Sequence, residues 1–320
     1  MSTLRMQGLY PATVTPFDED LKIDFAGLDA HLGATAEADG VRGLVVNGHV
    51  GEVLQLSSTE RADIVRHALT VRRPGQPVIA GIEANTADDL VREATNAAEA
   101  GADGLLVLPP IDVRPYRRLA KHPASVMHYF EALDKQVGLP TVVHQYPDFT
   151  GCAYSIEVLR EVVALDSVVA IKAASFSPTR YAEVWDAFHD DVAVLAATDA
   201  PALLGMLLHG AHGALIGIGV IDPPTWAELI AAATGGDAER ARQVFLGRCV
   251  PLMDTVFENQ EPTELRSEAA STKEALVQLG QFASSRVRPP ACDVDDEARA
   301  EIGATLERIG LLRPTAHVSR

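Results

Sequence analysis

The sequence predicts an α/β fold, a (β/α)8 TIM barrel with a C-terminal helical extension. Eight short apolar runs alternate with amphipathic, Ala/Glu/Arg-rich segments within residues 1–235. The runs are unbroken, as in parallel strands that are buried on both faces. Eight strand–helix pairs in this length match the usual size of such a barrel. A doubly wound open sheet is the alternative, but neither GxGxxG after the first strand nor GxxxxGK[ST] occurs.

The strands are expected where the apolar runs lie, and the helices between them. The strands are expected at 8–17, 41–48, 77–84, 104–110, 140–147, 167–174, 192–199 and 213–219. The helices are expected near 26–38, 58–72, 86–100, 120–137, 155–165, 178–189, 200–210 and 223–234. Ser57 and Glu60 have the spacing of a capping box, which predicts the start of the second helix.

The strand pattern stops after residue 235. Amphipathic patterns within 237–258, 263–282 and 293–312 predict three further helices, with the proline-marked connector "VRPPAC" at 287–292. We therefore expect two regions, a barrel catalytic domain over 1–235 and a helical region over 236–320 packed on it.

Composition excludes several classes of function. A formal charge of −17 provides no basic surface for a phosphate backbone, which argues against nucleic-acid binding. Neither a signal segment nor a run of about 18 apolar residues occurs, so we expect a cytoplasmic protein that does not contact membranes. Cys152, Cys249 and Cys292 are widely spread and lack CxxC spacing, which indicates neither a disulfide framework nor a zinc site.

A lysine lies near the carboxyl end of the sixth expected strand, in the apolar run "SVVAIKAASFS" (167–177). An unpaired ammonium in an apolar interior is costly, so Lys172 requires a partner or a chemical role. It shares a strand face with Ala170 and Ala174, whose small side chains leave room beside it. Active sites of such barrels lie at the carboxyl ends of the strands, so Lys172 is expected to point into the barrel mouth. Partial desolvation there would lower its pKa, and a neutral amine attacks a ketone to form a Schiff base.

The alternative for Lys172 is an outward orientation between helices. The other four lysines all fall in polar or helical contexts, which makes Lys172 the exception; they are Lys22, Lys121, Lys135 and Lys273.

Strand five contributes two candidate acid/base residues. His144 and Tyr146, in "VVHQYPDFTG", share one face of the strand and could project into the same mouth as Lys172. A histidine there can move protons near neutral pH. The alternatives are a hydrogen-bonded core histidine and a packed tyrosine ring.

The glycine-rich turn after strand two is a candidate anion site. Gly48 and Gly51, followed by Glu52, form a G-x-x-G-E turn whose successive backbone N–H groups suit a carboxylate. His49 lies within this turn. An ordinary βα turn would have a similar sequence.

The ends of strands seven and eight carry weaker signals. Gly217 and Gly219 would let a ligand approach the backbone, although glycine also marks barrel bends. Asp199 could line the mouth, but a helix N-cap is the favoured role. His209 and His212 indicate a helix-end turn, so the sequence predicts no metal site and no cofactor.

These motifs together resemble the dihydrodipicolinate synthase/N-acetylneuraminate lyase family of class I Schiff-base aldolases and dehydratases. The resemblance spans residues 8 to about 311. It includes "ATVTPF", the 48–52 loop, "IK" on strand six, "GIGVIDPP" and "STKEAL…RPP", together with Pro147, Thr150 and Gly151. It implies that Lys172 condenses with pyruvate or another 2-keto acid, and that the loop, Val50 included, binds the substrate carboxylate. It also implies a homo-oligomer, either a tetramer or a tight dimer.

The sequence departs from the family pattern at the substrate pocket. His49 and Val50 replace the loop's hydroxyl pair, and His144 replaces the acid/base tyrosine. Phe149 stands where dihydrodipicolinate synthases carry an arginine, and their paired tyrosines align with Pro110 and Ile111. These departures argue against lysine biosynthesis, since function depends on the site.

The leading hypothesis is a lyase in which Lys172 forms an imine and His144 or His49 moves protons. Aldol cleavage and dehydration of a 3-deoxy-2-keto acid share this chemistry and are not separated. Residues expected to border the substrate are Tyr146, Phe149, Ile218 and Gly219. The alternatives are a non-catalytic paralogue that binds a small acid, and a metal-dependent barrel lyase, which the lack of clustered ligands disfavours.

Overall fold

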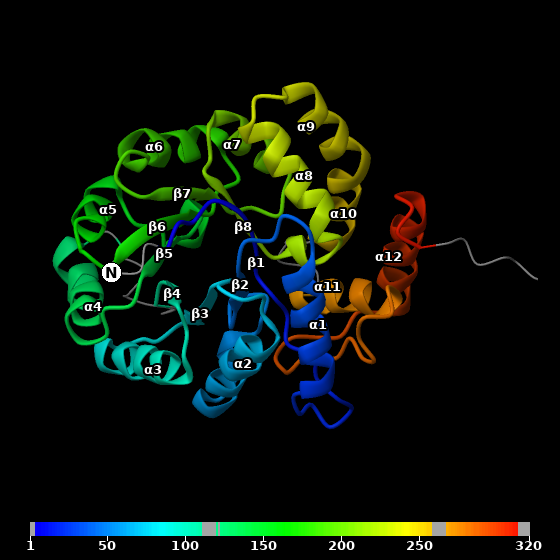
Figure 1. The fold of residues 1–320 in the computed structure, drawn as a ribbon, viewed down its shortest axis with the longest axis horizontal. Coiled ribbons are helices and arrows are strands. Elements are labelled where there is room, and N and C mark those ends of the chain that lie inside the picture. The colour runs from blue at the N-terminus through cyan, green and yellow to red at the C-terminus, as the bar shows by residue number, and fades with distance from the viewer. Residues whose placement is uncertain (1–3, 111–119, 121, 258–266, 313–320) are drawn as a thin grey trace, which may run out of the picture.

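The computed structural model describes residues 4–110, 120, 122–257 and 267–312 and contains an eight-stranded parallel barrel (Figure 1). The strands are β1 (Gly8–Pro11), β2 (Leu44–Val46), β3 (Val78–Ile82), β4 (Gly104–Val107), β5 (Thr141–Gln145), β6 (Val168–Ala173), β7 (Ala193–Ala196) and β8 (Gly213–Ile216). Their spatial order is β1-β8-β7-β6-β5-β4-β3-β2. Parallel bridges Leu9–Val41 and Ala12–Val45 join the first strand to the second and close the ring. The predicted fold class is confirmed.

Eight helices follow the strands and cover the outside of the barrel (Figure 1). They are α1 (Phe25–Glu37), α2 (Ser58–Val71), α3 (Ala87–Ala100), α4 (Pro123–Gln136), α5 (Ile156–Val163), α6 (Pro178–Phe188), α7 (Ala202–His209) and α8 (Pro223–Thr234). The capping box at the start of α2 is confirmed: the Ser57 amide donates to Glu60 Oε2 over 2.8 Å, and the Glu60 amide donates to Ser57 Oγ. This box satisfies orphan amides of the first helical turn.

The strands end earlier than their apolar runs predict. Within the described ranges, short 3-10 turns follow β2, β5 and β8, at Val53–Gln55, Asp148–Thr150 and Ile218–Val220. Asn47 and Glu52 adopt left-handed backbone conformations, with φ of 56° and 60°, which no extended strand accommodates. The carboxyl ends of β2, β5 and β8 therefore turn into loops, and those loops carry much of the candidate site.

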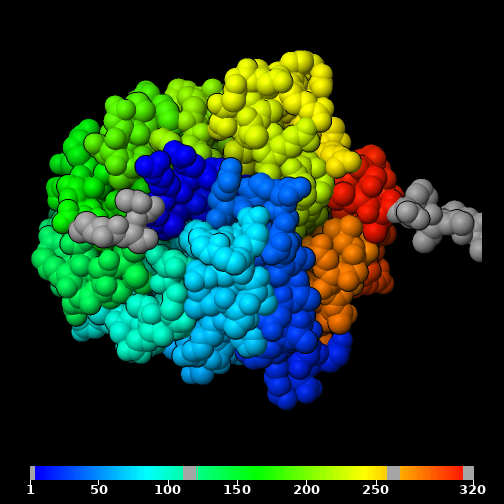
Figure 2. All heavy atoms as spheres, viewed as in Figure 1, coloured from blue at the N-terminus to red at the C-terminus, as the bar shows by residue number. Residues whose placement is uncertain are grey.

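The C-terminal region contains α9 (Ala238–Val244), a π-helical turn (Phe245–Cys249), α10 (Val250–Val256), α11 (Glu268–Gln278) and α12 (Asp296–Arg308). The helix expected at 263–282 is shorter in the structure, and residues 263–266 lie outside the described range. Figures 1 and 2 show α11 and α12 together at one side of the barrel. Leu276 and Leu306 belong to the same buried core as the barrel strands. The boundary at residue 235 remains a prediction.

One buried ion pair ties this C-terminal region to the barrel. The Lys273 ammonium, on α11, pairs with the Glu52 carboxylate in the loop after β2 and donates to the Arg286 carbonyl over 3.0 Å. Its nitrogen also lies 4.2 Å from the centroid of the Phe17 ring. Lys273 lies in the expected helical context, on α11, but it is fully buried, so Lys172 is not the sole buried lysine among the described residues. Lys121 lies outside the described range.

No helix in the described ranges is long and apolar enough to cross a membrane.

Candidate active site

A cavity of about 260 Å³ opens at the carboxyl ends of the strands. Its lining comes from β5 and β6, from the segments that follow β1, β2, β5, β6, β7 and β8, and from one residue of α11. The lining residues are Ala12, His49, Val50, His144, Tyr146, Pro147, Phe149, Thr150, Lys172, Ala174, Phe176, Ala197, Thr198, Asp199, Gly217 and Glu268. This is the end of the barrel at which such folds build their active sites.

Lys172 lies on β6, inside the barrel, and lines this cavity. Its side chain is almost fully buried, with 9% of its surface exposed. Burial lowers the pKa of the ammonium to about 8, and the charges of Asp199 and Glu268 oppose that shift. A substantial fraction of the amine is therefore neutral close to physiological pH, which is the form that attacks a carbonyl carbon.

His144 lies directly beside Lys172, because the two residues are register partners on β5 and β6. Burial, together with the nearby Lys172 and His49 charges, holds the pKa of its imidazole well below the usual range. Nδ1 is buried and has no hydrogen-bond partner. The ring is thus a neutral group with an unoccupied nitrogen, able to accept a proton beside the lysine.

Tyr146 continues the same face of β5, two residues beyond His144. The two rings meet edge to face, with centroids 4.4 Å apart. The tyrosine hydroxyl is buried without a partner, and burial raises its pKa far above the usual range. It is therefore a neutral hydrogen-bond donor and not a base at neutral pH.

The loop after β2 brings His49 and Val50 to the cavity rim. His49 Nδ1 lies 3.7 Å from Glu268 Oε2, a carboxylate that α11 supplies, and 60% of the imidazole is exposed. The interaction with the Glu268 carboxylate raises the pKa of His49, whereas burial lowers the pKa of His144, so His49 carries positive charge more readily than His144. A cation at this rim suits the carboxylate of an acidic substrate.

The two loop glycines shape the turn and do not line the cavity. The Gly51 amide donates to the Gly48 carbonyl over 3.1 Å, and the Glu52 amide donates to the His49 carbonyl over 3.0 Å. These two amides are therefore already bonded within the loop. A side chain at position 51 would meet the Thr13 carbonyl at 3.0 Å, which favours glycine there.

Besides the two glycines, three further residues predicted to bind the substrate lie outside the cavity lining. The Glu52 carboxylate is occupied by Lys273 and by the Arg288 amide, which donates to Oε1 over 3.1 Å. Ile218 and Gly219 are buried in the 3-10 turn after β8, and Gly217 lines the cavity in their place. Glu52 is thus a residue that fixes the loop and not one that faces a ligand.

Asp199 lines the cavity at the end of β7 and does not cap the next helix, so the favoured N-cap role was wrong. The N-cap position of α7 is Pro201. Asp199 Oδ1 instead accepts a hydrogen bond from the Ile218 amide over 2.9 Å, which joins the loops after β7 and β8. Burial raises the pKa of this carboxyl to about 6.

Two exposed aromatic rings form the outer wall of the cavity. Phe149, after β5, and Phe176, after β6, have ring centroids 5.6 Å apart. They are 75% and 44% exposed, which is unusual for phenylalanine. Such a pair is suited to an apolar group that extends from the cavity.

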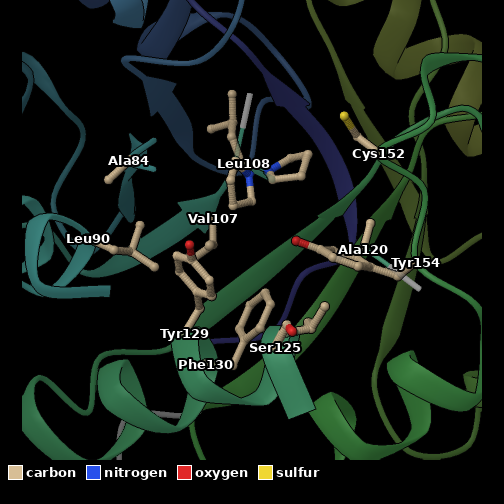
Figure 3. A pocket seen from close by; sticks show the side chains of 13 residues that line it. Ala84, Leu90, Val107, Leu108, Ala120, Ser125, Tyr129, Phe130, Cys152 and Tyr154 are labelled. Atoms are coloured by element: carbon tan, nitrogen blue, oxygen red, sulfur yellow. The ribbon is translucent and has the colours of Figure 1, made fainter. Parts of the chain in front are cut away.

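A separate, narrow pocket adjoins the site on the side of β3 and β4 (Figure 3). Tyr129 and Phe130 rise from α4 toward Val107, and among the described residues no charged side chain lines this space. It shares no lining residue with the Lys172 cavity. We assign it no chemistry.

Sequence reasoning missed two acids at this end of the barrel. Glu268 reaches the site from α11, 96 residues beyond Lys172, and no local pattern marks it. Glu83 follows β3 directly and has both carboxylate oxygens buried without a partner. Its position at a strand end was the available signal. Ile111, which aligns with one of the family's tyrosines, lies outside the described range.

In the part of the chain that the structure describes, no three His, Cys, Asp or Glu side chains lie close enough to hold a metal ion.

The fold and this site define a (β/α)8 barrel protein with a partly desolvated lysine in its mouth. The chain belongs to the dihydrodipicolinate synthetase family, whose model matches residues 5–309. Members of this family are aldolase-type lyases that act on small keto acids.

The relatives match nearly full length at low identity. The chain is 27% identical to 4-hydroxy-tetrahydrodipicolinate synthase from Methanosarcina mazei, covering 96% of this chain and 99% of the relative. It is 30% identical to the protein of the same name from Phenylobacterium zucineum, covering 96% and 98%.

Solved structures agree in fold. Dihydrodipicolinate synthase from Aquifex aeolicus is 26% identical, with a TM-score of 0.83 over 96% of this chain and 99% of that one. A prophage protein of the same family from E. coli K12, solved in complex with pyruvate, is 25% identical with a TM-score of 0.84 over 96% and 99%. This low identity is that of a divergent member.

Proposed function

We propose that this protein is a Schiff-base-forming lyase that acts on pyruvate or a 3-deoxy-2-keto acid. The observation that carries the proposal is the position of Lys172, buried in the barrel interior, on the wall of the cavity and beside His144. A relative solved in complex with pyruvate supports the choice of keto acid.

The chemistry follows from the neighbouring groups. The neutral Lys172 amine attacks the keto carbon, and loss of water gives an imine that withdraws electrons from C3. His144, neutral and with a free nitrogen, accepts the proton that C3 releases. His49, paired with Glu268 at the rim, binds the substrate carboxylate in place of the family's hydroxyl pair.

We further propose that the second substrate differs from that of the dihydrodipicolinate synthases named above. The family resemblance implies an arginine at the position of Phe149, and here Phe149 and Phe176 present an apolar wall instead. The nearby Arg180 is paired with Asp148 over 2.8 Å. An apolar tail is therefore favoured at the cavity mouth over an acidic one. We also propose a homo-oligomer, although one family relative at 25% identity is described as a monomeric variant.

Deuterium exchange tests the proposal without knowledge of the second substrate. Pyruvate in deuterated water should lose its methyl protons in the NMR spectrum when the protein is added, because the imine exchanges C3 protons. Lys172→Ala should abolish the exchange. If the wild type shows pyruvate-dependent thermal stabilisation and no exchange, the protein is a non-catalytic binder and the lyase proposal fails.

A further inference from the structure

Glu83 is a buried acid at the carboxyl end of β3, and its charge interacts with His49 and Tyr146, two residues that line the Lys172 cavity. We propose that Glu83 is a further catalytic residue, which carries the proton of the C4 hydroxyl in a 4-hydroxy-2-keto acid. This inference rests on the proposed Schiff-base function and narrows its substrate class to 4-hydroxy-2-keto acids. It assigns the proton of the C4 hydroxyl to Glu83, separately from the C3 proton that His144 accepts.

The strand registers place Glu83 in the same register row as Lys172. Ile82 pairs with Val107, and Val107 pairs with Val143. The Leu108 amide donates to the Ile82 carbonyl over 3.0 Å, so the ladder continues by one more residue. The next row therefore contains Glu83, Leu108, His144 and Lys172, with the last two paired directly. Register partners in parallel strands direct their side chains to the same face, so Glu83 points into the barrel as Lys172 does.

The separation of the two strands suits a small substrate between them. β3 and β6 are three positions apart in the barrel, which is about 14 Å along the sheet at the usual strand spacing. By this register, both side chains belong to the inward-facing set of the barrel. A carbon chain of three or four atoms can then be held at one end by Lys172 and meet Glu83 near the other.

The polar groups in this interior lack partners. Both Glu83 oxygens, His144 Nδ1, the Tyr146 hydroxyl and Thr198 Oγ1 are buried without a hydrogen bond. Each such group costs about 1–3 kcal/mol, and native proteins contain few of them. Four residues with such groups, at the carboxyl ends of β3, β5 and β7, indicate a surface suited to a hydrogen-bonding ligand.

The surroundings of Glu83 keep its carboxyl available for proton transfer. Burial raises its pKa to about 7, and His49 and Arg61 oppose that shift. Tyr146 is the other titratable group that interacts with it. Arg61 does not neutralise Glu83, because its guanidinium pairs with Glu93 over 3.1 Å and donates to the Val53 carbonyl. Such an acid changes protonation state near neutral pH.

The proposed step is the cleavage of the C3–C4 bond of the imine, and its reverse. In cleavage, the Glu83 carboxylate accepts the proton of the C4 hydroxyl, and the oxygen electrons form the aldehyde carbonyl. The C3–C4 bond breaks, its electron pair forms the C2–C3 double bond of the enamine, and the imine nitrogen accepts the displaced pair. In the reverse direction the enamine carbon attacks the aldehyde, and protonated Glu83 returns its proton to the new alkoxide.

The test separates this step from imine chemistry by using Glu83→Gln and two assays. Methyl deuterium exchange of pyruvate needs Lys172 but not a C4 hydroxyl, so the variant should retain it within about threefold. Cleavage of the pyruvate adducts of glyoxylate, glyceraldehyde and benzaldehyde needs both groups. For the adducts that the wild type cleaves, the variant should be slower by about 100-fold or more. The wild-type rate of cleavage should fall toward acidic pH as the Glu83 carboxylate is protonated. The Glu83→Gln variant should lack this fall.

Glu274→Gln is the matched control, since Glu274 is similarly buried but lies on α11, where it accepts a hydrogen bond from Ser285 and pairs with Arg299. It should keep the wild-type pH profile. Equal exchange and equal cleavage by Glu83→Gln would overturn the proposal, as would a wild type that exchanges pyruvate yet cleaves none of the three adducts. If the wild-type protein does not exchange the pyruvate methyl protons at all, the proposed Schiff-base function is refuted, and the role of Glu83 is refuted with it.

Discussion

His144 and Lys172 are direct register partners on adjacent parallel strands, and both side chains enter the same cavity. The imidazole is held neutral partly by the charge of the lysine, and its Nδ1 has no other partner. Because these two groups share one strand level, a proton released beside the imine has a nearby acceptor.

Replacement of His144 by alanine should lower turnover by roughly 10²–10⁴, which is the usual contribution of a positioned general base. Pyruvate methyl exchange should fall by a similar factor. Circular dichroism should show an intact fold. A variant with wild-type exchange would show that another group accepts the C3 proton.

The free energy of unfolding should depend on pH because of the buried Glu83 carboxyl. Burial raises the pKa of this carboxyl from 4.5 to about 7, so between these values the folded state holds a proton that the unfolded state has lost. Stability from this group therefore falls as pH rises from about 4.5 to 7 and is constant above. Glu83→Gln should remove that fall, amounting to roughly 3 kcal/mol. Denaturant unfolding of both proteins at pH 5 and pH 8 checks this, and a pH-independent difference would contradict it.

The buried pair of Lys273 with Glu52 should be important for stability. Lys273→Ala leaves the Glu52 carboxylate buried without its charged partner, which should cost about 3–5 kcal/mol in unfolding free energy. The double variant Lys273→Met with Glu52→Gln should recover much of that loss. Lys135→Ala, which breaks an exposed pair with Glu131, is the control and should cost at most about 0.5 kcal/mol. Equal effects of the two alanine variants would refute this assignment.

The aromatic wall should affect substrate choice and not imine formation. Phe149→Ala should raise KM for the pyruvate–benzaldehyde adduct by about tenfold, the size expected for one lost aromatic contact. The adduct of glyoxylate should change little. Leu208→Ala removes an exposed apolar side chain from α7 and serves as the control. Equal losses on both adducts would show that position 149 does not select the tail.

Local sequence patterns predicted the barrel well. The apolar runs mark all eight strands because parallel strands buried on both faces need continuous hydrophobic residues. Lys172 was recognisable for the same reason, since a charge within such a run is an exception. The strand ends were less predictable, because left-handed residues such as Asn47 and Glu52 have no strong local signal.

Contacts between distant segments were not predictable from the sequence. Glu268 meets His49 because α11 packs near the barrel mouth, and Lys273 meets Glu52 across the same contact. Asp199 has the residue type and position of a helix N-cap, and only the fold directs it to the Ile218 amide. Such contacts join residues far apart in the chain, so no local sequence pattern marks them.

Borohydride reduction in the presence of pyruvate tests the central claim most directly. Peptide mapping should find the reduced pyruvate adduct on Lys172 and none on Lys273, the other buried lysine, whose ammonium is held by Glu52. Lys172→Ala should give no adduct. An adduct distributed over several lysines, or none at all with pyruvate and a panel of other 2-keto acids, would contradict the account.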